Sequence, residues 1–203
     1  MSVIDTEAGL RALIGAPSEL VRLKIHDALN ATARAFIARA PIAFLATCGR
    51  DGMPTVSPKG DAPGFAQVED ERTLLLPERK GNKLIFSLQN ILENPQVGLI
   101  FLVPGTCETL RVQGRAQLLD DAALCERLAA RGSGALLVMR IAVEACYFHC
   151  AKAFLRAGLW EHEAWPDPIH VSFGAEIAQH GGFAADAVKD FDAAVQSRYK
   201  TEL

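Results

Sequence analysis

The segment VGLIFLVPGTCETLRVQGRAQLL (residues 97–119) sets the fold class of this chain because it predicts two β-strands joined by a turn. Its first seven residues are apolar or glycine, which is typical of a strand buried in a sheet. The proline and glycine after them predict a turn. Beyond the turn, Leu110 and Val112 alternate with Arg111 and Gln113, so one pair faces the core and the other pair faces away.

Further segments predict the rest of a sheet. Residues 42–48 (IAFLATC) predict a strand, and a turn with an Asp-Gly pair at residues 49–52 leads into the extended stretch 55–57. GFAQV and TLLL flank a polar turn at residues 69–72, which indicates a second hairpin, and residues 135–148 return to strand. Six or seven strands with few helical crossovers close most economically as a barrel. We therefore expect a mainly β fold with helices, a β-barrel of the α+β kind.

Helices are expected at both ends of the chain and after the second hairpin. Residues 6–40 show a rough 3.6-residue periodicity that Pro41 ends. Residues 81–95 switch to the helical period, and Asn82 is a suitable N-cap for them. Two more helices are expected, a short one over residues 121–131 and an amphipathic one over residues 183–199.

The elements predict a single domain over residues 1–203. A helical segment (1–40) precedes the barrel (41–160), and a tail with a helix (161–203) follows it. We expect the helices at both ends to pack onto the barrel. Half of the residues are apolar, so the chain can build a real core and wholesale disorder is excluded.

Charge and composition also limit the class of protein. The net charge is −3 with acidic and basic residues mixed, so no basic surface for nucleic acid is expected. No apolar run reaches the length of a membrane span, and the N-terminus lacks the features of a signal peptide. The five cysteines are odd in number and irregularly spaced, which is typical of reduced thiols. We expect a cytoplasmic protein with neither a membrane nor a nucleic-acid partner.

The stretch PTVSPKGDAPGF (residues 54–65) places a lysine among prolines and glycines. Pro58 is expected to break the strand that precedes it, because proline cannot donate to a ladder. Ser57 and Lys59 flank this proline, and the glycines allow the backbone to approach a ligand closely. The stretch is either an ordinary loop or a site for an anionic ligand.

A second basic cluster, Arg79, Lys80 and Lys83, follows the next hairpin and opens the helix that Asn82 would cap. A helix N-terminus presents unpaired N–H groups that suit a phosphate, and an arginine adds bidentate hydrogen bonds. If the two hairpins are neighbours, both loops reach one phosphorylated ligand. The alternative is that these cations are solvated surface side chains.

Three stretches of the chain resemble the pyridoxamine 5′-phosphate oxidase-related family of FMN-binding split-barrel proteins. They are FLATCGRDGMPTVSPKGDAPGF, LPERKGNKLIFSLQNILENPQVGLIFLVPG and ETLRVQGRAQL, which contain the patterns SPKGD, R-x-GN and LRV-x-G in this order. The resemblance extends from about residue 5 to about residue 165. It implies a split β-barrel homodimer that binds FMN at the subunit interface and acts on a small-molecule substrate or electron donor.

The resemblance also implies roles for individual residues. The stretch from Val56 to Lys59 corresponds to the strand beside the flavin ring and ribityl chain. Three further sets of positions correspond to parts of the family's FMN site. These parts are the phosphate-binding residues, the strand that approaches the flavin from the partner subunit, and a segment that closes over the site. The implied FMN-binding residues are Val56, Ser57, Pro58 and Lys59, then Arg79, Lys80, Asn82 and Lys83 for the phosphate, Arg111 and Gln113 from the partner, and Lys152, Arg156 and Trp160 over the site.

The chain departs from true pyridoxamine phosphate oxidases at two places. Pro54 stands where they have an arginine, and the C-terminal DAAVQSRYKTEL lacks their arginine–histidine substrate motif. FMN binding is therefore expected, whereas oxidation of pyridoxine phosphate is not. The expected activity is an FMN-dependent oxidoreductase with no evident catalytic acid or base. The alternatives are a non-catalytic flavin-binding or sensing module, or a split barrel that uses the deazaflavin F420 or heme.

Two other groups of residues could form a site, one from possible metal ligands and one from a pair of tryptophans. Cys146, His149 and Cys150 in CYFHCAK make a poor metal site because no second pair of ligands accompanies them, and no metal is expected. Trp160 and Trp165 form either a lid over a flat ring or a hydrophobic anchor for the tail.

Overall fold

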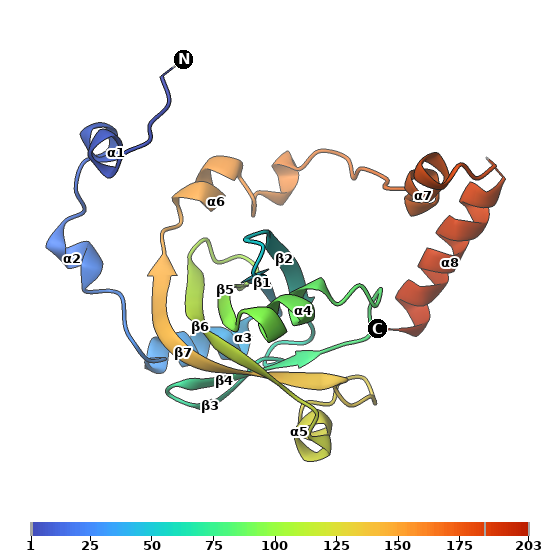
Figure 1. Cartoon of the computed structure of the whole chain (residues 1–203), viewed down its shortest axis with the longest axis horizontal. Helices are drawn as coiled ribbons and strands as arrows, with labels where there is room; N and C mark the ends of the chain where they lie inside the picture. The colour runs from blue at the N-terminus through green and yellow to red at the C-terminus, as the bar shows by residue number, and fades with distance from the viewer. Residues whose placement is uncertain (1, 185, 203) are drawn as a thin grey trace.

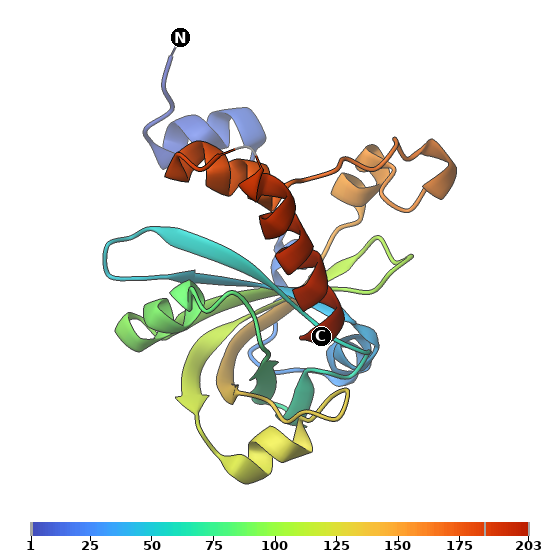
Figure 2. The ribbon, with the colours of Figure 1, turned by 90° about the vertical axis from the view of Figure 1, so that its right-hand side faces the viewer.

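The computed structural model describes residues 2–184 and 186–202. Seven antiparallel strands form one sheet in the order β2-β1-β5-β6-β7-β4-β3 (Figure 1). The sheet curls around a core, and among the described residues its edge strands β2 and β3 do not pair with each other, so the barrel is split (Figure 2). The expected mainly β, α+β fold is confirmed. The strands are β1 (Ile42–Cys48), β2 (Pro54–Gly60), β3 (Gln67–Asp70), β4 (Thr73–Glu78), β5 (Gln96–Leu102), β6 (Thr109–Leu119) and β7 (Leu137–His149).

The predicted hairpin of β5 and β6 lies at the centre of the sheet. Leu99 and Phe101 on β5 are buried together with Leu110 and Val112 on β6, so these side chains face the core. Arg111 and its neighbours in the alternation therefore lie on the other side of the sheet. The alternation predicted from the sequence is therefore present, and the structure shows that Leu110 and Val112 are the inner pair.

The side of the sheet that faces away from the core is called the outer face here. Residues paired across neighbouring strands point to the same side, and one such row runs through Pro58, Phe44, Ile100, Arg111 and Tyr147. The row begins at the edge strand β2 and ends on β7, four strands away. The outer face carries both apolar side chains and the Arg111 guanidinium.

Strand β2 does not end at Pro58, which corrects the expectation from the sequence. Lys59 and Gly60 still pair with β1, opposite Ala43 and Ile42. An edge strand needs hydrogen bonds on one side only, so a proline is tolerated where its nitrogen faces away from the ladder. Successive β2 side chains therefore point to opposite sides of the sheet through the whole SPKG segment.

Residues 6–40 form three helices instead of the expected single helical stretch. They are α1 (Glu7–Ile14), α2 (Glu19–Arg22) and α3 (Ala31–Arg39). Gly15 ends α1 with a φ of 81°, a conformation that favours glycine. Only α3 packs on the core, through Ala33 and Ile37, whereas α1 and α2 bury no residue.

The C-terminal tail contains two helices, α7 (Phe173–Gly181) and α8 (Ala187–Thr201), of which only the second was expected. They pack on each other: the Ser172 hydroxyl donates to Asp192 at 2.6 Å, and Gly174 N donates to the same carboxylate at 2.8 Å. A Cβ at Gly174 would lie 2.2 Å from the Val188 carbonyl oxygen, so this crossing requires glycine.

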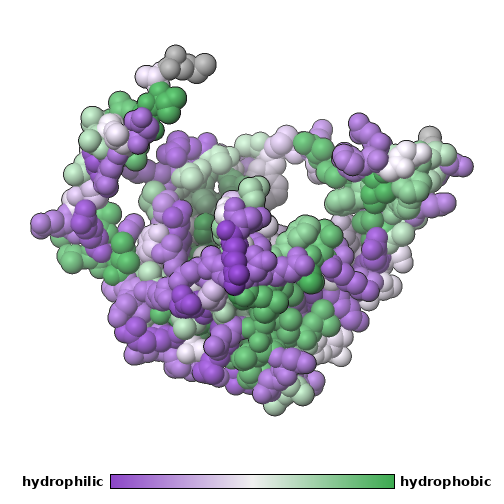
Figure 3. All heavy atoms as spheres, in the orientation of Figure 1, coloured by the Kyte–Doolittle hydropathy of each residue, from purple (hydrophilic) through white to green (hydrophobic). Residues whose placement is uncertain are grey.

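The expectation that all terminal helices pack on the barrel is therefore wrong for most of them. Figure 1 shows α1 and α2 extending from one side of the barrel and α7 and α8 from the other. Both extensions carry hydrophobic side chains on their surfaces (Figure 3). Leu13 is 72% exposed and Phe183 is 53% exposed. The apolar side chains on which the helix predictions rest are therefore present, but in a single chain many of them stay exposed.

Shorter helices complete the structure. They are α4 (Phe86–Glu93), α5 (Ala122–Arg127), α6 (Lys152–Ala157) and a 3-10 turn, η1 (His162–Ala164). The Asp121 carboxylate caps α5 by accepting from Leu124 N at 2.9 Å. No helix among the described residues has the length and apolar character of a membrane span.

Gly114 allows β6 to pass the irregular part of β7, and this predicts a stability effect. A Cβ at Gly114 would lie 2.1 Å from the Ala142 carbonyl oxygen, whereas a Cβ at Gly98 meets nothing closer than Ala46 Cβ at 3.9 Å. We expect Gly114→Ala to lower the free energy of unfolding by about 3 kcal/mol or more. Gly98→Ala, the control in the same sheet, should change it by less than about 1 kcal/mol. Urea unfolding measures both, and equal effects would contradict this packing.

Candidate ligand-binding site

A pocket of about 540 Å³ lies where the end of β2 meets the loop after β4. Its volume falls within the range of small-molecule sites. Two segments far apart in sequence, residues 57–61 and 77–82, line it together with a third at 130–136 and the end of α8. The predicted site residues that line it are Ser57, Pro58, Lys59, Arg79, Lys80 and Asn82. The two loops singled out from the sequence thus form one pocket.

Three ion pairs hold Lys59, Arg79 and Arg131 in this pocket. Lys59 Nζ lies 2.6 Å from Glu78 Oε2, and both side chains are largely buried. Arg79 Nε lies 3.1 Å from Asp61 Oδ2, and Arg131 Nε lies 3.9 Å from the other oxygen of that carboxylate. Asp61 is only 9% exposed, so the two guanidinium groups take the place of water around its carboxylate.

One nitrogen of the Arg79 guanidinium is left without a partner among the described residues. Its Nε donates to Asp61, and its Nη2 donates to the Leu128 carbonyl at 2.8 Å. Its Nη1 is buried and has no hydrogen-bond partner in the described structure. A buried guanidinium N–H without an acceptor is costly, so this position favours an anionic ligand.

The loop between β4 and α4 differs from the expectation that Asn82 caps the helix. Helix α4 begins after Ile85, whose φ is 48°, and Lys83 has a φ of 63°. The Asn82 side chain instead accepts a hydrogen bond from Leu84 N at 3.0 Å, within the loop. Two non-glycine residues in the left-handed region mark a strained loop, which is common where a backbone is shaped for a ligand. Lys83 does not line the pocket.

Hydroxyl groups fix α4 against the sheet. Ser57 Oγ and the buried Ser87 Oγ are 2.7 Å apart, so Ser57 contacts α4 and not its own backbone. Asn90 Nδ2 donates to Thr47 and Thr55, whose hydroxyl oxygens are themselves 2.8 Å apart. These bonds tie α4 to β1 and β2, and they hold the loop that carries Arg79 and Lys80 next to Lys59.

The remaining predicted residues lie elsewhere in the chain. Val56, which is 64% exposed, points to the outer face, as do Arg111 and Gln113 on β6. Trp160 donates its indole N–H to the Thr106 carbonyl at 3.0 Å and stacks near Phe154, which anchors it to the β5–β6 turn. Lys152 and Arg156 are exposed on α6. One chain therefore brings together only part of the predicted site.

Sequence reasoning missed the acidic half of the pocket. Asp61 and Glu78 stand within the quoted motifs, directly beside the cations, and this adjacency was a usable signal for ion pairs. Arg131, which has a φ of 52°, comes from a loop after α5. Nothing in the sequence around Arg131 points to the pocket, because the contact depends on how β7 pairs with β4.

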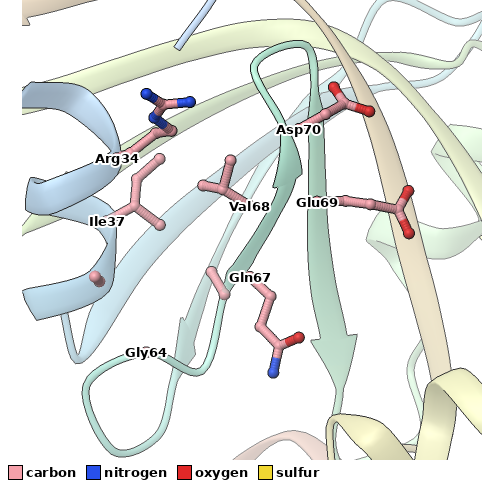
Figure 4. A pocket seen from close by; sticks show the side chains of 9 residues that line it. Arg34, Ile37, Gly64, Gln67, Val68, Glu69 and Asp70 are labelled. Carbon is pink, nitrogen blue, oxygen red and sulfur yellow. The ribbon is translucent and has the colours of Figure 1, made fainter. Parts of the chain in front are cut away.

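A second pocket of about 470 Å³ lies between α3 and the β3–β4 hairpin and contains none of the predicted residues. Val68 points from the hairpin toward Ile37, whereas Glu69 points away from the helix (Figure 4). Glu69 is paired with Arg140 at 3.0 Å. This hollow is therefore lined by a core contact and by a carboxylate that already has a partner.

The cysteine and histidine group on β7 does not form a metal centre in the described residues, where no three His, Cys, Asp or Glu side chains cluster suitably. All five cysteines are free thiols. Burial raises the pKa of the Cys146 thiol to about 11, whereas Cys150 is exposed.

Because the thiolate is the reactive form, the two cysteines should differ in alkylation. At pH 8 we expect iodoacetamide to modify Cys150 in the native protein at least about tenfold faster than Cys146. In denaturant the two rates should converge. Mass spectrometry of digested protein after timed labelling measures this, and equal native rates would show that Cys146 is not buried.

The sequence has no match among curated proteins, whereas solved structures resemble it in fold. HupZ from Group A Streptococcus is 20% identical with a TM-score of 0.48, over 59% of this chain and 92% of that one. An FMN-binding protein from Syntrophomonas wolfei is 12% identical with a TM-score of 0.47, over 58% and 84%. An F420 reductase is 19% identical with a TM-score of 0.42, over 56% and 94%.

The family comparison covers more than half of the chain. The sequence model described as pyridoxamine 5′-phosphate oxidase matches residues 29–150, which extend from just before α3 to just after β7. The matched region thus contains the entire sheet and most of the pocket. The chain belongs to the pyridoxamine 5′-phosphate oxidase family.

Proposed function

We propose that this protein binds FMN in the pocket beside β2 and serves as an oxidoreductase that transfers hydride or electrons between the flavin and a small molecule. The observation that carries the proposal is the buried Nη1 of Arg79, which has no hydrogen-bond partner in the described structure and belongs to a residue that lines the 540 Å³ pocket. A phosphate oxygen is a strong acceptor that satisfies such a group. Family membership supports a flavin as the molecule that carries this phosphate.

The roles of the pocket residues follow from their existing partners. Arg79 is held in place by Asp61 and the Leu128 carbonyl, so its free edge is pre-organised for an anion. Lys80 adds a second cation without a carboxylate partner in the described structure. Lys59 is already neutralised by Glu78, so we assign it to the flavin ring or ribityl chain and not to the phosphate. Asn82 and Lys83 shape and charge the same loop.

A bound flavin supplies the redox chemistry at its N5, and the protein supplies position and electrostatics. Hydride transfer at that atom needs no acid or base from the chain. The residues on β2 would orient the ring through the backbone from Val56 to Lys59. A cation at the edge of the ring stabilises negative charge on the reduced form, and Arg111, which has no ion pair among the described residues, can supply it.

We propose that two chains form the complete site. Phe44 and Val56 are exposed on the outer face, and a symmetric dimer would cover them. Arg111 and Gln113 share this face but lie on β6, three strands from β2. They reach a ligand beside β2 if they come from the partner subunit. The same holds for Lys152, Arg156 and Trp160, which we assign to the rim of the partner's site.

The alternatives are less well supported by the pocket. F420 carries a long anionic tail, whereas Asp61, Glu78 and Glu202 place three carboxylates around this pocket. His149, the axial ligand considered for heme, lies on β7 and does not line the pocket. A non-catalytic flavin-binding module would fit the same residues. A kinetic measurement separates this module from an oxidoreductase, because NADH or NADPH would reduce FMN bound to the module no faster than free FMN.

Removing the arginine that carries the proposal should weaken FMN binding selectively. We expect Arg79→Ala to raise the FMN Kd by about 10- to 100-fold, because charge-assisted hydrogen bonds contribute about 1.5–3 kcal/mol. Arg50→Ala, in the turn at the opposite end of β2, is the matched control and should leave Kd unchanged. Titration followed by flavin fluorescence measures both. An unchanged Kd for a folded Arg79→Ala protein would contradict the phosphate assignment.

A further inference from the structure

A group of cations surrounds Tyr147 at the far end of the outer face. Arg111 Nη1 lies 3.5 Å from the Tyr147 hydroxyl, and its guanidinium carbon lies 6.0 Å from the ring centroid. Lys24 Nζ lies 5.9 Å from the same centroid. His149 is two residues further along β7, on the same side of the strand as Tyr147. We call Lys24, Arg111, Tyr147 and His149 the Tyr147 cluster.

The backbone holds this cluster in place. His26 and Cys146 exchange two hydrogen bonds, with His26 N donating at 2.9 Å and Cys146 N donating at 2.7 Å. This bridge draws the segment before α3 against β7 and thereby sets Lys24 beside Tyr147. Arg111 faces Tyr147 directly in the β6–β7 ladder. Two different parts of the chain therefore bring a cation to the end of β7 where Tyr147 and His149 lie.

No carboxylate balances these charges among the described residues. The ion pairs found there involve other cations, such as Arg72 with Asp27 and Arg140 with Glu69, and none includes Lys24 or Arg111. Arg111 Nε is buried and has no hydrogen-bond partner in the same part of the chain. Of the buried side-chain polar atoms described, only this one and Arg79 Nη1 lack a partner. Such a group is costly unless an acceptor binds to it.

The protonation of His149 responds to the same environment. Burial lowers its pKa first, and the charges of Arg111 and Lys24 lower it further. The groups that face His149 are Arg111 from β6, Lys24 from the segment before α3, and Tyr147 from β7 itself. A bound anion would reverse this charge balance and favour the protonated imidazole.

We propose that Lys24, Arg111 and His149 form a binding site for the anionic group, a phosphate or a carboxylate, of the small molecule that reacts with the flavin. This inference rests on the proposed function. The cluster is four strands from the β2 pocket, roughly 19 Å along the sheet at the usual strand spacing. The two sites therefore serve one reaction when the cluster of one subunit meets the pocket of its partner. The substrate is then an organic anion, and its charge is held apart from the phosphate of FMN.

The test uses the full-length protein and follows the imidazole signals of His149 by NMR while pH is varied, with and without inorganic phosphate or acetate. We expect at least one of these anions to raise the pKa of His149 and to leave that of His180, on α7, unchanged. Phosphate alone would identify a phosphate group, and acetate alone a carboxylate. If neither anion moves the His149 titration, the proposal is wrong.

Substitutions assign the effect to the cluster. Lys24→Ala and Arg111→Gln should each weaken binding of the active anion by about tenfold. Lys189→Ala, a lysine on α8 outside the cluster, is the matched charge control and should not. Equal anion affinities in Lys24→Ala and Lys189→Ala would overturn the assignment. Lys24→Ala should retain full FMN affinity. If the unaltered protein binds no FMN but its His149 still responds to the anion, the proposed function is wrong and the anion site stands.

Discussion

The buried Asp61 carboxylate and the Arg79 guanidinium that faces it form the interaction on which the candidate site depends. The Asp61 carboxylate is only 9% exposed, and Arg79, which lies 3.1 Å from it, offsets the cost of burying it. In the same contact Asp61 fixes the orientation of Arg79 and leaves Nη1 facing no acceptor among the described residues. The pair joins the loop after β2 to the loop after β4, so the shape of the pocket and the anion binding that we propose for it have one physical origin.

The alternation of side chains along β2 imposes a second constraint. Ser57 and Lys59 point to the side where α4 and Glu78 lie, and Val56 points to the outer face. No ligand beside one chain can contact all the implied residues, because the sheet itself separates them. The exposed apolar side chains of the outer face and the buried Arg111 Nε, which lacks a partner in the described structure, favour a second copy that completes the arrangement. The site that we propose is therefore complete only in a dimer, and such a dimer would also cover the apolar surface.

Much of the fold follows from local patterns in the sequence. The strand at residues 109–119 was predictable because alternation of apolar side chains is a direct consequence of strand geometry. The interrupted N-terminal helices were not, since periodicity over residues 6–40 continues across the break at Gly15. The course of β2 through Pro58 depends on its place at the sheet edge, which is a tertiary property. The start of α4 depends on left-handed backbone at Lys83 and Ile85, for which these residue types give no signal. For the site, the cations were visible in their motifs, whereas Arg131 and the contact of Lys24 with Tyr147 arise from distant segments.

The most direct test of a site shared between two subunits is the FMN content of mixed dimers. Arg79→Ala breaks the pocket, and the double variant Arg111→Ala/Gln113→Ala breaks the face contributed by the partner. Refolding the two variants together places unlike chains in about half of the dimers, and each such dimer has one intact site. The shared-site account predicts that the mixture binds about a quarter of the FMN bound by the unaltered protein, whereas each variant alone binds little. A mixture that binds no more FMN than the separate variants would show that the two sets of residues do not meet across an interface.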